Sequence, residues 1–394
     1  MDVCRSLKGD SMRSDFKATT IERQVKCDRR KFIKGAFAIC FGSFYALGRC
    51  LSASSAISLI RARFYKPLSD GKVACELCPR RCIVAQGERG FCGARENRNG
   101  TYYTLVYGRV CAKLIDPIEK LPLYHVLPGI KTFGIATACC NLNCKYCQSW
   151  QISQVRPEDT QSVYMRPSDV VEEAKALGCR AIAYTYTEPV NFIEYAIDCA
   201  KEARKAGLLN ICHTAAYINP QPMRELCSYM DAINIDLKSF SDSFYRDVCG
   251  GELKPVLDAI KIAASESNAW LELTYLVVPS LNDDQRSVKE MCEWLKQNVG
   301  TDVPLHFTRF FPMYKLRNLP ATPAKTIDAL RHVAFQSGLK YVYVGNVPGH
   351  GGESTYCPRC GSLLIQRVNY VIRSNRIRKG RCPDCGMPIP GIWG

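Results

Sequence analysis

Closely spaced cysteines are the residues of this sequence most able to do chemistry. The chain has 394 residues and 23 cysteines, many for a chain that can build its own core. Eleven fall into three groups with short gaps, and such neighbours compete as disulfide partners but suit a shared metal. The others are mostly isolated, and we expect them to be small buried hydrophobes. The groups are the central cysteine group (Cys140, Cys144 and Cys147), the N-terminal cysteine group (Cys75, Cys78, Cys82 and Cys92) and the C-terminal cysteine group (Cys357, Cys360, Cys382 and Cys385).

The central cysteine group, with spacing C-x3-C-x2-C, follows directly on an apolar, strand-like run at residues 132–138. It is therefore expected in a loop at the carboxyl end of that strand. A structural zinc takes four protein ligands in a closed tetrahedron, and these three cysteines have no obvious fourth ligand nearby. Three thiolates on a four-iron cluster leave one iron open to a cofactor or substrate. The spacing favours a [4Fe-4S] cluster, with a structural zinc as the alternative.

The other two groups each offer four ligands, which makes a closed metal site. The N-terminal cysteine group fits zinc or an auxiliary iron–sulfur cluster; sequence does not separate the two, and zinc is slightly preferred. The C-terminal cysteine group forms two C-x2-C knuckles, each followed by a glycine. This pattern predicts a zinc ribbon, with rubredoxin-type iron as the alternative.

Alternating strand and helix patterns must position the central cysteine group. Helical patterns, with apolar residues three or four apart, lie between most of the strand-like runs. Ser168 is expected to cap one such helix and Gly178 to end it. This alternation implies parallel strands with right-handed crossovers, hence an open α/β sheet or partial barrel with its chemistry at the carboxyl ends of the strands. The expected strands are residues 132–138, 181–186, 208–213, 232–236, 271–278, 305–310 and 341–344.

Composition divides the chain into four parts. Residues 1–66 are a leader and basic linker, residues 67–129 carry the N-terminal cysteine group, residues 130–349 are the α/β core, and residues 350–394 are a small tail. Most of the net charge of +16 lies at the ends, since residues 1–66 carry 14 Lys and Arg against 5 Asp and Glu, and residues 350–394 carry 7 against 2. The nearly neutral core gives no case for a polyanionic partner, and for the basic tail a lid or docking role is preferred over nucleic-acid binding.

The leader resembles a twin-arginine export signal. Arg29 and Arg30 precede a mostly apolar run that is too short to cross a bilayer comfortably. Such signals export proteins that are already folded and loaded with cofactor. A basic amphipathic leader that is never cleaved is the alternative. We expect cofactor assembly in the cytoplasm and membrane contact only through this leader.

The central cysteine group, with Tyr146 before its last cysteine, resembles the motif of the radical S-adenosylmethionine (SAM) superfamily. Stretches such as CELCPRRC, GFCG, DPIEKLPLYH, CNLNCKYCQSW, NIDLKSF and NVPGH are similar to the AmmeMemoRadiSam-system radical SAM enzymes, relatives of the pyruvate formate-lyase activating enzyme. The resemblance covers residues 67–394 and implies a partial (β/α)6-type TIM barrel. It also implies that SAM binds the open iron and that one electron cleaves SAM to a 5′-deoxyadenosyl radical. Cys139, just before the first ligand of the motif, is expected not to bind the cluster.

The resemblance also implies cofactor-binding residues, beginning with Tyr146. Glu188 resembles the acid that holds the SAM amino group, although the two glycines before it in the motif are replaced here, one of them by Tyr186. Asp236 and Lys238 resemble the DLK stretch that lies near SAM in activating enzymes. The alternatives are a helix N-terminal acid for Glu188 and a plain salt bridge for Asp236 and Lys238.

The sequence is consistent with two functions. The first is a radical SAM enzyme acting on an unidentified substrate, with a glycyl residue of a protein as one candidate. It requires a [4Fe-4S] cluster, SAM and a low-potential electron donor, with zinc at the C-terminal cysteine group. The second is an iron–sulfur or zinc module that carries electrons or binds nucleic acid without SAM chemistry. The neutral core argues against the second.

Overall fold

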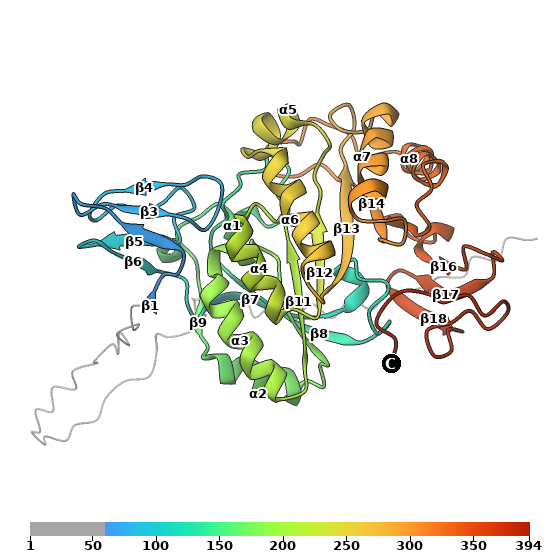
Figure 1. The fold of residues 1–394 in the computed structure, drawn as a ribbon, viewed down its shortest axis with the longest axis horizontal. Helices are drawn as coiled ribbons and strands as arrows, with labels where there is room; N and C mark the ends of the chain where they lie inside the picture. The colour runs from blue at the N-terminus through green and yellow to red at the C-terminus, as the bar shows by residue number, and fades with distance from the viewer. Residues whose placement is uncertain (1–59) are drawn as a thin grey trace, which may run out of the picture. The chain divides into compact units, whose positions relative to one another are not determined.

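A mixed β-sheet forms the centre of the computed structural model, which describes residues 60–394 (Figure 1). β7 (Arg109–Pro117) lies antiparallel beside the first parallel strand, and β9 (Val163–Tyr164) pairs with β7. Within the described residues the sheet is open, because β15 lies at one edge and β9 at the other. The parallel strands, in chain order and in order across the sheet, are β8 (Lys131–Thr137), β10 (Ala181–Tyr184), β11 (Leu209–Thr214), β12 (Ala232–Asp236), β13 (Trp270–Val277), β14 (Leu305–Arg309) and β15 (Val342–Gly345).

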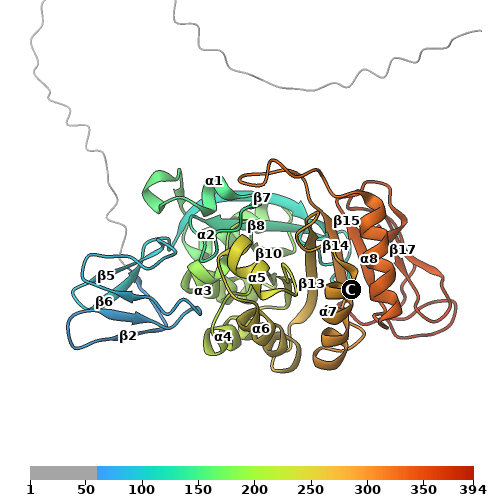
Figure 2. The same cartoon turned by 90° about the horizontal axis from the view of Figure 1, so that it is seen from above.

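A long helix separates each parallel strand from the next, so the predicted strand–helix alternation and partial (β/α)6 architecture are confirmed. α4 and α6 pack against each other, as do α7 and α8, and these helices lie along one face of the sheet (Figure 2). Their apolar residues recur at helical spacing and face the sheet, whose parallel strands are almost wholly buried. The helices are α2 (Pro167–Ala176), α3 (Ile193–Lys205), α4 (Pro220–Tyr229), α6 (Leu253–Ser265), α7 (Gln285–Asn298) and α8 (Ala324–Gln336).

The two ends of α2 test the predicted helix signals. Gly178 follows the helix with φ of 69°, in the left-handed region that favours glycine, as predicted. The prediction that Ser168 caps the helix is wrong, because the helix already begins at Pro167. Asp169 accepts a hydrogen bond from the N–H of Arg166 at 2.8 Å. Proline suits the first helical position because its missing N–H would have no partner there.

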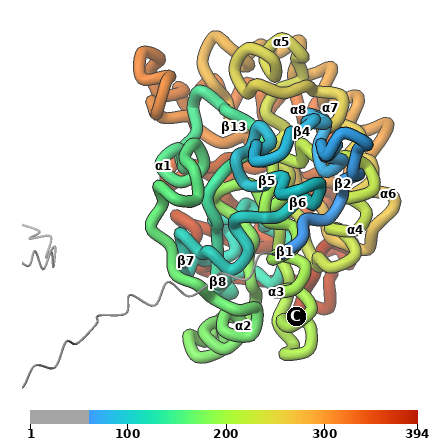
Figure 3. The backbone as a smooth tube through the Cα atoms, turned by 90° about the vertical axis from the view of Figure 1, so that its left-hand side faces the viewer, coloured from blue at the N-terminus to red at the C-terminus, as the bar shows by residue number. Residues whose placement is uncertain are grey.

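Two small sheets carry the N-terminal cysteine group and lie over one end of the core (Figure 3). Arg95 anchors them, because it donates two hydrogen bonds of 2.8 Å to Glu194 on α3. The two side chains are 0% and 4% exposed, and parting such a pair would leave a buried charge without a partner. The strands are β2 (Tyr65–Pro67), β3 (Val73–Cys75) and β4 (Ile83–Val84) in one sheet, and β1 (Ile60–Arg61), β6 (Thr101–Thr104) and β5 (Arg95–Arg98) in the other.

The C-terminal tail forms a third small antiparallel sheet, and its contact with the core includes a buried cation. Arg367 donates hydrogen bonds of 2.7 Å to the carbonyl of Tyr124 and to Oγ1 of Thr355, and its Nε lies 3.7 Å from Glu119. The segment between β7 and β8 thereby joins the tail to the sheet. The strands of the tail are β16 (Thr355–Tyr356), β17 (Leu363–Val368) and β18 (Val371–Asn375).

His125 makes the attachment of the tail sensitive to pH. Its buried ring lies 2.6 Å from the carbonyl of Pro390 through Nδ1, which must donate, and 2.6 Å from the hydroxyl of Tyr343 through Nε2, which accepts. Burial lowers the pKa of His125 from 6.5 to about 4. Between these values the unfolded chain binds a proton that the folded chain does not, so stability falls as the pH falls. We expect His125 to cost about 1.4 kcal/mol of unfolding free energy per pH unit across that window.

Urea unfolding at several pH values within the window measures this slope. His125→Gln should flatten the slope by about that amount relative to the wild type. His332→Gln, at an exposed position on α8, is the matched control and should leave the slope unchanged. An unaltered slope in H125Q would contradict the assignment of a neutral, buried His125.

The leader, with its twin-arginine-like signal, lies outside the described residues, so that interpretation stays a prediction. Over residues 60–394, no helix has both the length and the apolar character needed to cross a membrane.

Candidate active site

The loop that follows β8 presents the central cysteine group. All three cysteines line one cavity of about 350 Å³ at the carboxyl ends of the parallel strands. The N–H of Leu142 donates to Sγ of Cys140 at 3.4 Å, and the hydroxyl of Ser153 lies 3.2 Å from Sγ of Cys147. Donors directed at sulfur stabilise thiolates that bind iron. The residues present therefore fit a [4Fe-4S] cluster, which Cys140, Cys144 and Cys147 would hold beside the cavity.

Cys139 lies beside these ligands but outside the lining of the cavity. Its φ is 85°, its side chain is buried, and its Sγ donates to the carbonyl of Val155 at 3.5 Å. The thiol is thus turned toward the chain that follows α1 (Trp150–Ser153). This position agrees with the predicted role of Cys139 as a residue that does not bind the cluster.

A π-helical turn at Tyr245–Cys249 supports the ligand loop from the other side. The N–H of Asn143 donates to the carbonyl of Cys249 at 3.0 Å, and a Cβ at Gly250 would overlap the Asn143 side chain. The hydroxyl of Tyr146 lies 3.5 Å from Sγ of Cys249, while Tyr146 itself lines the cavity. Sequence reasoning missed Cys249, because an isolated cysteine in an apolar pattern carries no signal of a neighbouring metal site.

Glu188 follows β10 and lines the same cavity. Its Oε1 accepts hydrogen bonds from Oγ1 of Thr214 at 2.5 Å and from the N–H of Val190 at 3.1 Å, and its Oε2 accepts from the N–H of Ala215 at 2.8 Å. Burial raises the pKa of Glu188, and these three donors act in the opposite direction. Oε2 has one donor among the described residues, so it can still accept a hydrogen bond from an ammonium group.

Tyr186 fills a place where the superfamily motif has glycine, and it keeps a backbone suited to glycine, with φ of 63°. Its ring folds back across β8 at Gly134, where a Cβ would overlap the hydroxyl. That hydroxyl donates to Asp116 Oδ2 at 2.6 Å, and Lys120 donates to Oδ1 of the same carboxylate at 2.7 Å. A non-glycine residue in this left-handed conformation raises the free energy of the folded chain by about 1–2 kcal/mol, and the contacts of the Tyr186 hydroxyl offset this cost.

Asp236 and Lys238, at the end of β12, also line the cavity. The two side chains form a salt bridge, which is the alternative role that the sequence leaves open for them. Nζ of Lys238 lies 2.9 Å from Oδ2 of Asp236, and Nε2 of His213 lies 3.1 Å from Oδ1. Burial acts to raise the pKa of Asp236, but the charge of Lys238 and the hydrogen bond with His213 outweigh it and hold that pKa below its usual value. The ion pair therefore presents an ionised carboxylate and a cation beside the central cysteine group.

The far wall of the cavity contains polar side chains that sequence reasoning did not assign. Nε2 of His306 on β14 lies 2.7 Å from the carboxylate of Glu272. Tyr370, at the tip of the β17–β18 hairpin, donates its hydroxyl to Asn346 at 2.8 Å. Glu119 is fully buried, and its Oε2 has no hydrogen-bond partner among residues 60–394. The tail thus supplies part of the cavity wall, which no local sequence pattern reveals.

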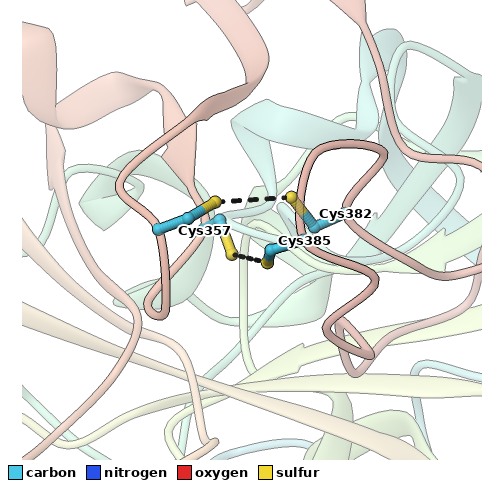
Figure 4. A group of neighbouring side chains, drawn as sticks. Cys357, Cys382 and Cys385 are labelled. Carbon is cyan, nitrogen blue, oxygen red and sulfur yellow. Dashed lines mark hydrogen bonds between the residues drawn. The ribbon is translucent and has the colours of Figure 1, made fainter.

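The C-terminal cysteine group has the geometry of a single-ion site. The sulfurs of Cys357 and Cys385 are 3.5 Å apart, and those of Cys360 and Cys382 are 3.7 Å apart. All four sulfurs lie within 4.8 Å of one another, and Figure 4 shows the three labelled side chains turned toward a common centre. Four thiolates at this spacing can surround one metal ion tetrahedrally.

Comparisons with known proteins identify a family and several similar proteins. The radical SAM superfamily matches residues 135–295, which span the central cysteine group and the strands up to β13. The uncharacterised Methanocaldococcus jannaschii protein MJ0808 is 44% identical over 330 residues, covering 83% of this chain and 98% of the relative. The GTP 3′,8-cyclase of Lactiplantibacillus plantarum is 24% identical over 286 residues, covering 66% of this chain and 81% of the relative.

Among solved structures, a domain of the pyruvate-formate lyase-activating enzyme of Bacteroides vulgatus matches with a TM-score of 0.38 and 16% identity. The match covers 42% of this chain and 99% of that domain.

An open parallel α/β sheet with a C-x3-C-x2-C loop at the carboxyl end of its first parallel strand defines a radical SAM enzyme. The chain belongs to the radical SAM superfamily, whose members are enzymes that use a [4Fe-4S] cluster and SAM. This family membership favours the radical SAM enzyme over the competing interpretation, a module without SAM chemistry.

Proposed function

We propose that the central cysteine group holds the cluster and SAM at the mouth of the described cavity, and that the enzyme removes a hydrogen atom from a substrate bound there. When bound, the reduced cluster and SAM supply a 5′-deoxyadenosyl radical for this step. The observation that carries the proposal is that one cavity is lined by every residue implied for the cluster and SAM: Cys140, Cys144, Cys147, Tyr146, Glu188, Asp236 and Lys238.

The chain's own residues would bind, orient and shield the reactants. Glu188 would accept the SAM ammonium group on Oε2, because its other lone pairs are already directed at protein donors. Asp236 is kept ionised by Lys238 and His213 and would accept hydroxyl donors from the cofactor. The buried wall at His306 would limit access of water to the reacting atoms.

Anaerobic reconstitution with iron and sulfide, followed by dithionite and SAM, tests the proposal. We expect methionine and 5′-deoxyadenosine to form in equal amounts. A protein that binds the cluster on the central cysteine group but releases no 5′-deoxyadenosine would overturn the proposed function.

Glu188→Gln is expected to weaken SAM binding by about 10- to 100-fold, since a hydrogen bond to a charged group contributes about 1.5–3 kcal/mol. Glutamine keeps the shape of the side chain but loses the charge that attracts the ammonium group, and its amide faces protein donors. Equilibrium dialysis of cluster-loaded protein gives the Kd. Glu290→Gln, at an exposed position on α7, is the control. If both variants have wild-type iron content and equal affinity, the role of Glu188 is refuted.

We further propose that the enzyme is of the AmmeMemoRadiSam type, that a low-potential protein reduces it, and that a glycyl residue of a protein is its substrate. This further proposal is supported by the similarity of stretches such as CELCPRRC and NVPGH, which extends across residues 67–394, to the AmmeMemoRadiSam-system enzymes. A glycyl radical, seen by electron paramagnetic resonance (EPR) on a candidate protein after turnover, would test the substrate. The C-terminal cysteine group is proposed to bind zinc, because its sulfur spacing suits one tetrahedral ion.

A further inference from the structure

Two buried donors near the N-terminal cysteine group have no hydrogen-bond acceptor among residues 60–394. The hydroxyl of Tyr102 and Nε of Arg95 are buried and have no hydrogen-bond partner among the described residues. A Cβ at Gly90 would touch the Tyr102 hydroxyl and lie 3.8 Å from Sγ of Cys82, so the donor and the thiol face the same point. The N–H of Phe91 also donates to this sulfur, at 3.5 Å. Unpaired buried donors around thiols indicate that an anionic centre belongs between them.

The spacing of the sulfurs distinguishes a site for one zinc ion from a site for an iron–sulfur cluster. In the C-terminal cysteine group all four sulfurs lie within 4.8 Å, as four thiolates around one zinc must. Among residues 60–394 it is the one group of three or more ligand residues with that spacing, so the N-terminal cysteine group is wider. The central cysteine group is wider as well. In a [4Fe-4S] cluster each thiolate binds its own iron, which places the sulfurs farther apart than around a single ion.

The N-terminal cysteine group also lies next to the central one. Gly93, adjacent to Cys92, lies against Cys139, since a Cβ there would be 3.8 Å from the Cys139 sulfur. Nε of Arg80 donates to the carbonyl of Asn141 at 2.6 Å, inside the central ligand loop. Cys92 and Cys140 line one second cavity, of about 1020 Å³. A centre held at the first group would therefore be a direct neighbour of the catalytic cluster.

We propose that Cys75, Cys78, Cys82 and Cys92 hold an auxiliary iron–sulfur cluster that passes electrons to the cluster on the central cysteine group. The auxiliary cluster takes one electron from a low-potential one-electron donor and gives it to its neighbour. It is oxidised as the neighbour is reduced, and no covalent bond changes. The relay rests on the proposed function, whereas the identity of the centre does not.

Metal and sulfide analysis of anaerobically purified protein tests this identity without an activity assay. The wild type should contain about eight irons and about one zinc per chain. The triple variant C140A/C144A/C147A should keep about four irons with matching sulfide. Loss of all iron from a folded triple variant would overturn the proposal, and so would about two zinc ions per chain in the wild type. Failure of the proposed function alone would leave the iron of the triple variant in place.

Tyr102→Phe probes the contact with the cluster, and Tyr103→Phe, on the opposite face of β6, is its matched control. Loss of the hydroxyl donor should lower the reduction potential of the centre in the triple variant, whereas Y103F should not change it. No shift in Y102F would overturn the placement of a cluster beside Tyr102. In the reduced wild type, spin–spin coupling should broaden the EPR spectrum. A spectrum equal to the sum of two isolated clusters would overturn the relay.

Discussion

Cys140→Ala is expected to lose the catalytic cluster and SAM cleavage, whereas the neighbouring Cys139→Ala retains both. Cys140 lines the cavity and its sulfur receives the N–H of Leu142. Cys139 is turned away, with its sulfur directed at the carbonyl of Val155. Two ligands do not hold a four-iron cluster that must leave one iron open, so loss of Cys140 removes the site for SAM as well.

Iron content and 5′-deoxyadenosine yield measure both variants under identical reconstitution. We expect C140A to lose about four irons per chain and to form no 5′-deoxyadenosine, and C139A to match the wild type. Replacing the buried CH2SH side chain of Cys139 with a methyl group leaves only a small space, so C139A also controls for damage to the loop. If C139A loses the cluster and C140A keeps it, the register of the motif is shifted by one residue and the assignment fails.

Arg367→Ala is expected to cost about 3–5 kcal/mol of unfolding free energy, because it removes one partner from a buried ionic contact. Glu119 would remain buried without its neighbouring cation, and the carbonyl of Tyr124 would lose its donor. Burial raises the pKa of Glu119, and the charge of Arg367 opposes that rise. Loss of Arg367 should therefore leave a protonated Glu119 and a weakly attached tail.

Urea unfolding at constant zinc concentration gives the change in stability. Arg373→Ala lies on β18 of the same tail sheet at an exposed position and is the matched control, with an expected effect within about 0.5 kcal/mol. Equal stability of R367A and R373A would show that Arg367 does not join the tail to the core. Because Tyr370 lies in the cavity wall, R367A is also expected to weaken substrate binding.

Features carried by local pattern could be predicted from sequence, and features that depend on distant contacts could not. The parallel strands and the central ligand loop follow from apolar runs and from cysteine spacing, which persist whatever surrounds them. The positions of Cys249 and Tyr370 depend on segments about 100 residues or more from the ligand loop meeting in space. The prediction that Ser168 caps α2 is wrong because the neighbouring Pro167 occupies the first helical position and Asp169 hydrogen-bonds to the residue before that proline.

The close approach of Tyr186 to Gly134 restricts the order in which positions 134 and 186 can change during evolution. A side chain at position 134 would collide with the Tyr186 hydroxyl, whereas a smaller residue at position 186 meets no such obstacle and relieves the left-handed backbone. A lineage that enlarges position 134 must therefore first reduce position 186. We expect the two positions to covary among homologues, with bulky residues never present at both.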